Sequence, residues 1–357
     1  MRINKIQHSR LSTVDPNNSA FGANISDHML LCEYENGKWG EPVIVPYGPM
    51  NYSPALMSIH YGQAIFEGMK AYKDQNDEVF LFRPERNFER FNKSAERMAM
   101  PQISAEIFLD GLYALIDLDR GWVPTKPGIS LYIRPTMYAS EEMFSARISN
   151  KYTFAIMTSP AGAYYDKPLK IKIEDYYTRA VDGGAGFTKC AGNYGASFYP
   201  TLLANKAGFD QVIWTDSKEH KYFEESGTMN VMVRIGDTLY TPPTSTTILN
   251  GVTRDSLINV AKYHNIEVKE ERISVDDVVK AYKDGTLKEV FGCGTAVVVN
   301  RYSHVGYKDE ILELPQLSDE ESYAAFLKKQ LVGIQTNQLE DPFGWRVKVE
   351  KHQVEII

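Results

Sequence analysis

Polar and apolar residues alternate along several short stretches of the chain, which is the period of a β-strand. The first stretch predicts a hairpin that turns at Asn36-Gly37, and the second predicts two strands joined at a polar turn. A further hairpin is predicted around Gly236-Asp237. The predicted strand regions are residues 28–46, 64–84, 130–138, 152–159, 169–175, 208–216 and 230–243.

Other stretches repeat apolar residues every three or four positions, as an amphipathic helix does. Ser104 stands directly before one of them and predicts a helix cap there. The predicted helices are residues 83–98, 104–122, 195–206, 253–264, 275–283 and 319–336. Helices and strands therefore mix in both halves of the chain, and the pattern predicts an α/β protein with mixed sheets.

The length of the chain predicts two domains, because 357 residues exceed what one ordinary hydrophobic core supports. The small and turn-forming residues of "SPAGAYY", 159–165, mark the clearest break. We expect a smaller N-terminal α/β domain over residues 1–160, an interdomain loop over 161–174 and a larger C-terminal domain over 175–357.

The composition and charge of the chain indicate which classes of protein it can belong to. Apolar residues make up 43% of the chain and charged residues 24%, which is typical of a folded soluble protein. The net charge of −7 comes without a basic stripe, so nucleic acid is not an expected partner. The chain shows neither a secretion signal nor an apolar run of about 18 residues, so we expect a cytoplasmic protein with no membrane span.

The cysteines and histidines support no metal site. Cys32, Cys190 and Cys293 are far apart and odd in number, which favours thiols in a reducing compartment over disulfides. The histidines lack the close spacing that zinc ligands show in helices and hairpins, so no metal is expected.

The stretch "VDGGAGFTKCAGNYGASF", 181–198, surrounds Lys189 with five glycines. Glycine lets a backbone come close to a ligand, although a solvated lysine on a flexible loop would look the same. A phosphate loop of the G-x-x-x-x-G-K-[ST] kind is disfavoured, because Thr188 precedes the lysine and Cys190 follows it. The other chemical interpretation is a lysine that forms an imine with a carbonyl cofactor, with Gly192 leaving room for a flat ring.

A pyridoxal cofactor would also need an acid for its ring nitrogen, a phenol near its ring oxygen and donors for its phosphate. "EESGTMN", 224–230, offers carboxylates, and Gly251 leads into a predicted helix with Thr253 in its first turn, a natural anion site. "FGCGTA", 291–296, is another glycine turn and holds Thr295. Each of these segments alone is also common in purely structural loops.

Together, and in this order, such segments resemble the branched-chain amino acid aminotransferases, which belong to fold type IV of the pyridoxal phosphate enzymes. The matching segments are "FGANISDHMLLCEYENGKWG", "FEGMKAY", "LFRP", "LYIRPT", "SPAGAYY", "GGAGFTKCAGNYG", "ESGTMN", "ILNGVTR" and "FGCGTA". The resemblance implies the two-domain fold of these enzymes, with pyridoxal 5′-phosphate bound in the larger C-terminal domain.

The resemblance also implies roles for single residues. Lys189 would form the imine, Glu225 would face the ring nitrogen and Tyr194 would donate to the phenolic oxygen of the ring. The other implied cofactor contacts are Arg83, Thr228, Leu249, Gly251, Val252, Thr253 and Thr295. The implied substrate contacts are Tyr61, Phe66, Tyr132, Arg134 and Tyr164, with the Thr295-Ala296 backbone receiving the substrate carboxylate. Of these, Tyr132 and Arg134 would approach the site of a neighbouring subunit.

A homodimeric aminotransferase follows from the resemblance, moving the amino group between L-leucine, L-isoleucine or L-valine and 2-oxoglutarate in a ping-pong cycle. The alternatives are a D-amino acid aminotransferase or an aminodeoxychorismate lyase of the same fold, a non-catalytic cofactor-binding sensor, and a nucleotide-binding hydrolase. One departure stands out, because mammalian members carry a C-x-x-C pair shortly after "GTA" where this chain has Val297 and Asn300. The sequence leaves open whether the enzyme serves synthesis or breakdown.

Overall fold

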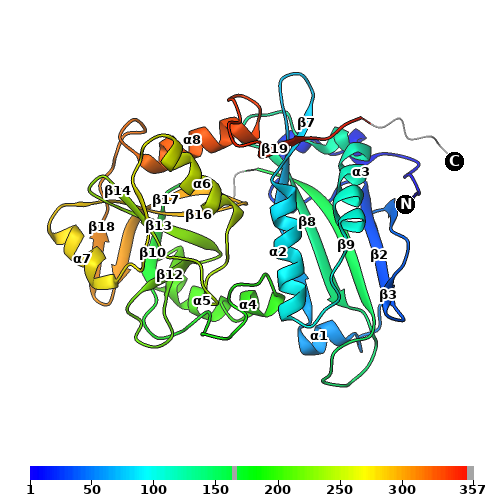
Figure 1. Ribbon diagram of the computed structural model, residues 1–357, viewed down its shortest axis with the longest axis horizontal. Helices are drawn as coiled ribbons and strands as arrows, with labels where there is room; N and C mark the ends of the chain where they lie inside the picture. The colour runs from blue at the N-terminus through cyan, green and yellow to red at the C-terminus, as the bar shows by residue number, and fades with distance from the viewer. Residues whose placement is uncertain (163–166, 352–357) are drawn as a thin grey trace. The chain divides into compact units, whose positions relative to one another are not determined.

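A computed structural model describes residues 1–162 and 167–351 of the protein. The chain packs as two compact units, which Figure 1 shows in ribbon form. Unit 1 comprises the described residues within 1–164, 188–191 and 334–357, and unit 2 those within 165–187 and 192–333. The short segment 188–191, which holds Lys189, therefore packs with unit 1 although both of its flanks belong to unit 2. The predicted division at residues 161–174 stays a prediction.

Unit 1 is built on a sheet that has ten strands within the described residues. Its main path runs β1-β4-β2-β9-β8-β6-β7-β19, and β3 and β5 pair at the side with β2 and β8. The strands are β1 Arg2–Ile3, β2 His28–Glu35, β3 Lys38–Trp39, β4 Val43–Pro46, β5 Ala64–Phe66, β6 Met69–Lys73, β7 Val79–Phe82, β8 Ser130–Ala139, β9 Tyr152–Ala161 and β19 Arg346–Lys348. The hairpin predicted at Asn36-Gly37 is confirmed as the β2–β3 turn.

Helices α2, Pro84–Arg97, and α3, Gly111–Leu118, lie on one face of the unit 1 sheet (Figure 1). Phe91 of α2 and Phe108, which lies just before α3, meet Phe154 of β9 in an aromatic cluster with ring centres 5.4–5.6 Å apart. A π-helical segment, Glu106–Asp110, leads into α3, and Ser104 accepts a hydrogen bond from the Ile107 amide as predicted. The remaining helical segments of unit 1 are α1 Met57–Tyr61 and the 3₁₀ turns Arg10–Ser12, Pro16–Asn18 and Arg120–Trp122.

The prediction of two strands over residues 64–84 was wrong in one respect, because the structure has three strands there. The chain leaves the sheet at Glu67-Gly68, between β5 and β6. A Cβ atom on Gly68 would lie 2.2 Å from the Tyr132 hydroxyl, so only glycine fits at this close approach. The Glu67 side chain is fully buried and bonds to residues of α2, which explains why the apolar alternation is interrupted here.

Unit 2 is built on a second sheet, with nine strands within the described residues. Its path runs β12-β11-β10-β17-β16-β13-β14-β15, and β18 pairs with β17. The strands are β10 Leu169–Ile173, β11 Gln211–Thr215, β12 Phe223–Ser226, β13 Met229–Ile235, β14 Thr238–Thr241, β15 Val268–Glu270, β16 Leu287–Gly294, β17 Val298–Tyr307 and β18 Glu310–Glu313. Parallel pairs of β10 with β11 and β17 stand beside antiparallel pairs, so the predicted mixed sheet is confirmed.

Four helices of unit 2 lie close to the predicted positions. They are α5 Phe198–Lys206, α6 Val252–Tyr263, α7 Val275–Lys283 and α8 Tyr323–Gln335, and the last two residues of α8 belong to unit 1. Residues 191–194 were not predicted as helical, but they form most of α4, Ala191–Gly195, whose first residue belongs to unit 1. Ser274 caps α7 by accepting a hydrogen bond from the Asp277 amide. In the part of the chain that the structure describes, no helix has the length and apolar character needed to span a bilayer.

Candidate active site

Lys189 is held by backbone hydrogen bonds on both sides. Its amide donates to the Ser94 hydroxyl of α2 at 3.1 Å, and its carbonyl accepts from the Phe66 amide of β5 at 3.0 Å. The next residue, Cys190, forms an isolated β-bridge with Ile65. The lysine therefore starts from a fixed backbone position, and its half-buried side chain places Nζ 4.9 Å from the centre of the Phe66 ring.

The Phe66 ring also contacts Arg134 of β8. The Arg134 guanidinium carbon lies 4.5 Å from the ring centre, and Nη2 donates to the Tyr132 hydroxyl at 3.1 Å. Unit 1 thus brings together four of the predicted site residues, Lys189, Phe66, Tyr132 and Arg134. Tyr61, at the end of α1, is exposed.

Arg83 takes the N-cap position of α2 in a left-handed backbone conformation, with φ of 50°. Pro84 follows at the first helical position, where its fixed φ suits a helix start. The Arg83 guanidinium lies over the Trp345 ring at 4.6 Å, and its amide donates to the Trp345 carbonyl. A non-glycine residue in this conformation is uncommon and marks a position that the surrounding structure holds in place.

Glu225, on β12, is one of several buried carboxylates of unit 2. Its Oε2 accepts from Nη2 of Arg179 at 2.7 Å, and its Oε1 accepts from the Leu249 amide at 2.8 Å and from Nδ2 of Asn230 at 3.3 Å. Two neutral donors and a buried guanidinium stabilise the ionised form of the carboxylate. The carboxylate is therefore held in one orientation.

The pairing of β12 with β13, and of β13 with β16, places further residues next to Glu225. Asn230 of β13 pairs with Glu225 on one side and with Cys293 of β16 on the other. Two residues after Cys293 comes the turn between β16 and β17, with Thr295 and Ala296 half-buried in it. Thr228 is exposed in the tight turn between β12 and β13.

Leu249 to Thr253, which the sequence predicts as an anion site, lie at the start of α6. Gly251 is the N-cap of this twelve-residue helix, and Val252 and Thr253 are buried in its first turn. The amides of a first turn have no partner within the helix, and the helix dipole adds partial positive charge there. A Cβ atom on Gly251 would lie 1.9 Å from Oδ1 of Asn230, so glycine is required where the chain passes this side chain.

Two predicted residues remain to be placed. Tyr194 is half-buried in α4 of unit 2, where its carbonyl accepts a hydrogen bond from the Ser197 hydroxyl at 2.7 Å. Tyr164 lies outside the described residues.

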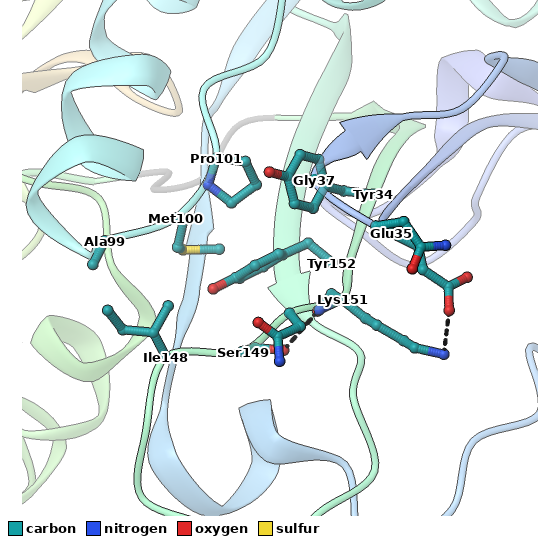
Figure 2. Close-up of a pocket in the computed structure, with 12 residues that line it drawn as sticks. Tyr34, Glu35, Gly37, Ala99, Met100, Pro101, Ile148, Ser149, Lys151 and Tyr152 are labelled. Carbon is teal, nitrogen blue, oxygen red and sulfur yellow. Dashed lines mark hydrogen bonds and ion pairs between the residues drawn. The ribbon is translucent and has the colours of Figure 1, made fainter.

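A cavity of about 550 Å³ lies elsewhere in unit 1. Figure 2 shows it between the β2–β3 turn, the end of α2 and the start of β9, with the Lys151–Glu35 ion pair of 2.6 Å at one side. Its lining residues are Tyr34, Glu35, Asn36, Gly37, Ala99, Met100, Pro101, Ile148, Ser149, Asn150, Lys151 and Tyr152. None of the predicted site residues that the structure describes lines this cavity. The cavity is therefore separate from the predicted site residues of unit 1.

Comparison with known proteins decides the family. Residues 64–303 match the family described as "Amino-transferase class IV". A probable branched-chain-amino-acid aminotransferase of Staphylococcus epidermidis is 45% identical over 343 residues, which cover 95% of each chain. Branched-chain-amino-acid aminotransferase 2 of Bacillus subtilis is 42% identical over 94% of this chain and 93% of its own.

This chain is a branched-chain-amino-acid aminotransferase family member. The resemblance noted from the sequence is therefore confirmed. The fold is confirmed as well, since the branched-chain aminotransferase of Thermobaculum terrenum, solved in its pyridoxal phosphate form, superposes with a TM-score of 0.73. That structure is 19% identical and covers 91% of this chain and 98% of its own.

The side chains of this aminotransferase suit pyridoxal phosphate, the cofactor of fold type IV enzymes. The cofactor needs an amine for its aldehyde, a negative charge for its ring nitrogen and donors for its phosphate. Lys189 offers the amine, and Glu225 offers a carboxylate that Arg179 keeps charged. The first turn of α6, which begins after Gly251, offers backbone amides and the positive end of the helix dipole to a phosphate.

The sequence interpretation missed Arg179 and Asn230, the two side chains that hold Glu225. Asn230 also donates to the Leu249 carbonyl at 2.9 Å, so it ties the carboxylate to the loop before α6. Asn230 stands in the matching block "ESGTMN" and could have been found from that position. No local pattern marks Arg179, because its partner Glu225 is far along the sequence and contacts it only in the folded unit 2.

The three cysteines are buried thiols. Burial raises the pKa of Cys32 to about 11 and that of Cys293 to about 12. At neutral pH both thiols are therefore protonated, which agrees with the interpretation of inert packing residues.

Proposed function

We propose that the enzyme transfers the amino group between L-leucine, L-isoleucine or L-valine and 2-oxoglutarate, with Lys189 as the residue that binds the cofactor. The observation that carries the proposal is the similarity over nearly the whole chain to branched-chain aminotransferases. The surroundings of Lys189 and Glu225 support it, because each side chain is fixed by several hydrogen bonds or ring contacts.

When bound, pyridoxal phosphate supplies an aldehyde that takes up the amino group and a ring that withdraws electrons from the Cα carbon. Lys189 would take the proton from the substrate Cα and deliver it to the cofactor. This transfer requires the lysine amine in its neutral form. Glu225 would hold the proton on the ring nitrogen through its negative charge. Thr253 and the amides of Gly251 and Val252 would bind the phosphate.

The remaining predicted contacts complete this proposal. Tyr194 would donate to the ring oxygen, and the Thr295-Ala296 backbone would receive the substrate carboxylate. Phe66 supplies an apolar wall beside Lys189. An apolar wall discriminates by only about 1–3 kcal/mol per methylene, so leucine, isoleucine and valine should all be accepted. Further proposed contacts are Arg83, Thr228 and Leu249 for the cofactor and Tyr61, Tyr132 and Tyr164 for the substrate.

We propose that Arg134 binds the second carboxylate of 2-oxoglutarate. Replacing Arg134 by methionine is therefore expected to raise KM for 2-oxoglutarate about tenfold or more, because this ion pair is lost. The KM for L-leucine should change much less, since its side chain carries no charge. Steady-state kinetics with both substrates measure the difference. Equal KM values for 2-oxoglutarate in both proteins would remove Arg134 from this role.

The visible spectrum of the purified enzyme tests the function directly. We expect an absorbance band of the lysine-bound cofactor that shifts when L-leucine is added and returns when 2-oxoglutarate follows. D-alanine and aminodeoxychorismate serve as controls, because they are substrates of the two alternative activities of this fold. A shift with either control and none with L-leucine would contradict the proposal.

We also propose that the enzyme works as a homodimer in the cytoplasm. Apolar side chains of α1 and of the segment between β8 and β9 are exposed, and large exposed apolar patches mark interaction surfaces. These residues are Ile59, Tyr61, Met143, Phe144 and Ile148. The buried free thiols suit a reducing compartment.

A further inference from the structure

Arg83 is a buried arginine whose side chain contacts an aromatic ring. Only 8% of the residue is exposed, and its guanidinium carbon lies 4.6 Å from the centre of the Trp345 ring. Arginine side chains are mostly found at the surface, and when buried they have specific partners. Trp345 is one such partner, and it reaches Arg83 from the far end of the chain.

The main chains of the two residues are joined as well. The Arg83 amide donates to the Trp345 carbonyl at 2.9 Å, directly beside the pairing of β7 with β19. Arg83 has a left-handed backbone with φ of 50°, which a residue other than glycine adopts mainly where its surroundings hold it. Trp345 therefore fixes Arg83 through the backbone and contacts its side chain at the same time.

The Trp345 ring is itself held in place. The Phe343 ring stacks against it, with 4.0 Å between the ring centres and 13° between the planes, and the Phe82 ring meets it edge-on at 5.8 Å. The Asp341 carboxylate fixes the turn before β19, because it accepts from the Phe343 amide at 3.1 Å and from the Arg346 amide at 2.7 Å. The ring thus offers the guanidinium a support in a fixed position.

An aromatic ring holds a guanidinium in a different way from a carboxylate. The negative face of the ring attracts the cation but carries no net charge, so this contact leaves the arginine its charge for an anion. A carboxylate would fix the guanidinium and neutralise it at once. A long side chain that is already held also loses less conformational freedom when it binds a ligand. The contact with Trp345 therefore suits an arginine that binds an anionic group.

We propose that Trp345 is a positioning residue for Arg83, and that its ring holds the guanidinium in place for the phosphate of pyridoxal phosphate. The inference deepens the proposed function and rests on it, because it takes Arg83 as a phosphate contact. The planar donors of an arginine match two oxygens of a phosphate, so their orientation matters for binding. Trp345 itself touches neither the cofactor nor the substrate in this proposal.

Titration of the full-length enzyme, after removal of bound cofactor, tests the proposal. Absorbance gives Kd for pyridoxal 5′-phosphate and for pyridoxal, which lacks the phosphate. The Kd for pyridoxal divided by the Kd for pyridoxal 5′-phosphate is the phosphate ratio. In Trp345→Leu we expect the phosphate ratio to fall about tenfold, because only binding of the phosphate form is weakened. The variant keeps the backbone carbonyl that binds the Arg83 amide, so it removes the ring alone.

Two variants control for the loss of an indole ring. Trp345→Phe keeps an aromatic face and should retain the wild-type phosphate ratio within about threefold. Trp39→Leu removes a tryptophan of unit 1 that packs against Tyr34 and donates to the Gln102 carbonyl, and it should leave the ratio unchanged. Partial unfolding weakens both ligands alike, so the ratio reports on the phosphate. Trp345→Met, which keeps more of the side-chain length, replaces Trp345→Leu if circular dichroism shows that the leucine variant unfolds.

Arg83→Met separates failure of this inference from failure of its premise. It is expected to lower the phosphate ratio about 10²-fold, and adding Trp345→Leu should lower it no further, because the ring acts only through the guanidinium. An unchanged ratio in folded Trp345→Leu, or the same fall with and without Arg83, would overturn the role of Trp345 and leave the phosphate contact standing. An unchanged ratio in Arg83→Met would remove both the contact and the inference. The spectrum with L-leucine tests amino transfer independently of either.

Discussion

Replacing Lys189 with arginine is expected to lower kcat for the half-reaction with L-leucine by about 10⁴-fold or more. Arginine keeps the positive charge and much of the length, but its guanidinium stays protonated and can neither bind the aldehyde nor take up the Cα proton. Single-turnover absorbance measurements with the cofactor supplied in excess measure the loss.

Lys206→Arg is the matched control, because Lys206 ends α5 as an exposed lysine. It should retain wild-type kinetics. Circular dichroism of both variants checks that the fold is kept. A Lys189→Arg enzyme with more than about a tenth of the wild-type rate would show that another group performs the proton transfer.

Replacing Glu225 with glutamine is expected to lower kcat by about 10²–10³-fold, because a neutral amide no longer stabilises the charge on the ring nitrogen. The same change leaves the buried Arg179 guanidinium without its anion. Breaking a buried ion pair from one side costs about 3–5 kcal/mol, so the free energy of unfolding should fall as well. Stopped-flow kinetics and urea denaturation measure the two effects separately.

Glu224→Gln provides the comparison within the same strand. Glu224 is buried like Glu225, burial raises the pKa of its carboxyl, and one oxygen accepts from the Thr247 hydroxyl at 2.6 Å. A glutamine oxygen can keep that hydrogen bond, so this variant should retain most of the activity. Equal losses of kcat in the two variants would mean that Glu225 contributes only to stability.

Much of the fold could be predicted from the period of the apolar residues. The long strands β8 and β9 and the helix α2 have strong patterns and lie where the patterns predicted them. The short strand β19 was missed, because three residues carry no period and their extended shape comes from pairing with β7. The break between β5 and β6 was missed because it depends on Tyr132, which is far from Gly68 in sequence.

The residues of the candidate site likewise fall into those that the sequence predicts and those that only the structure shows. Residues whose chemistry is rare in their setting, such as a lysine among glycines, stand out in the sequence. Residues that act through others do not, because their partners are distant along the chain. Ser94 and Lys189 are 95 positions apart, and only the folded unit 1 shows that they are bonded. The roles of Lys189 and Glu225 stay predictions, which the two substitutions above test.

The buried thiols have a practical consequence for handling the enzyme. Electrophiles and peroxides attack the thiolate form of cysteine, and both Cys32 and Cys293 hold their protons well above physiological pH. The residues that replace the C-x-x-C pair, Val297 and Asn300, offer no sulfur to oxidise. Cys32 and Cys293 should therefore react slowly with alkylating reagents and peroxides at neutral pH.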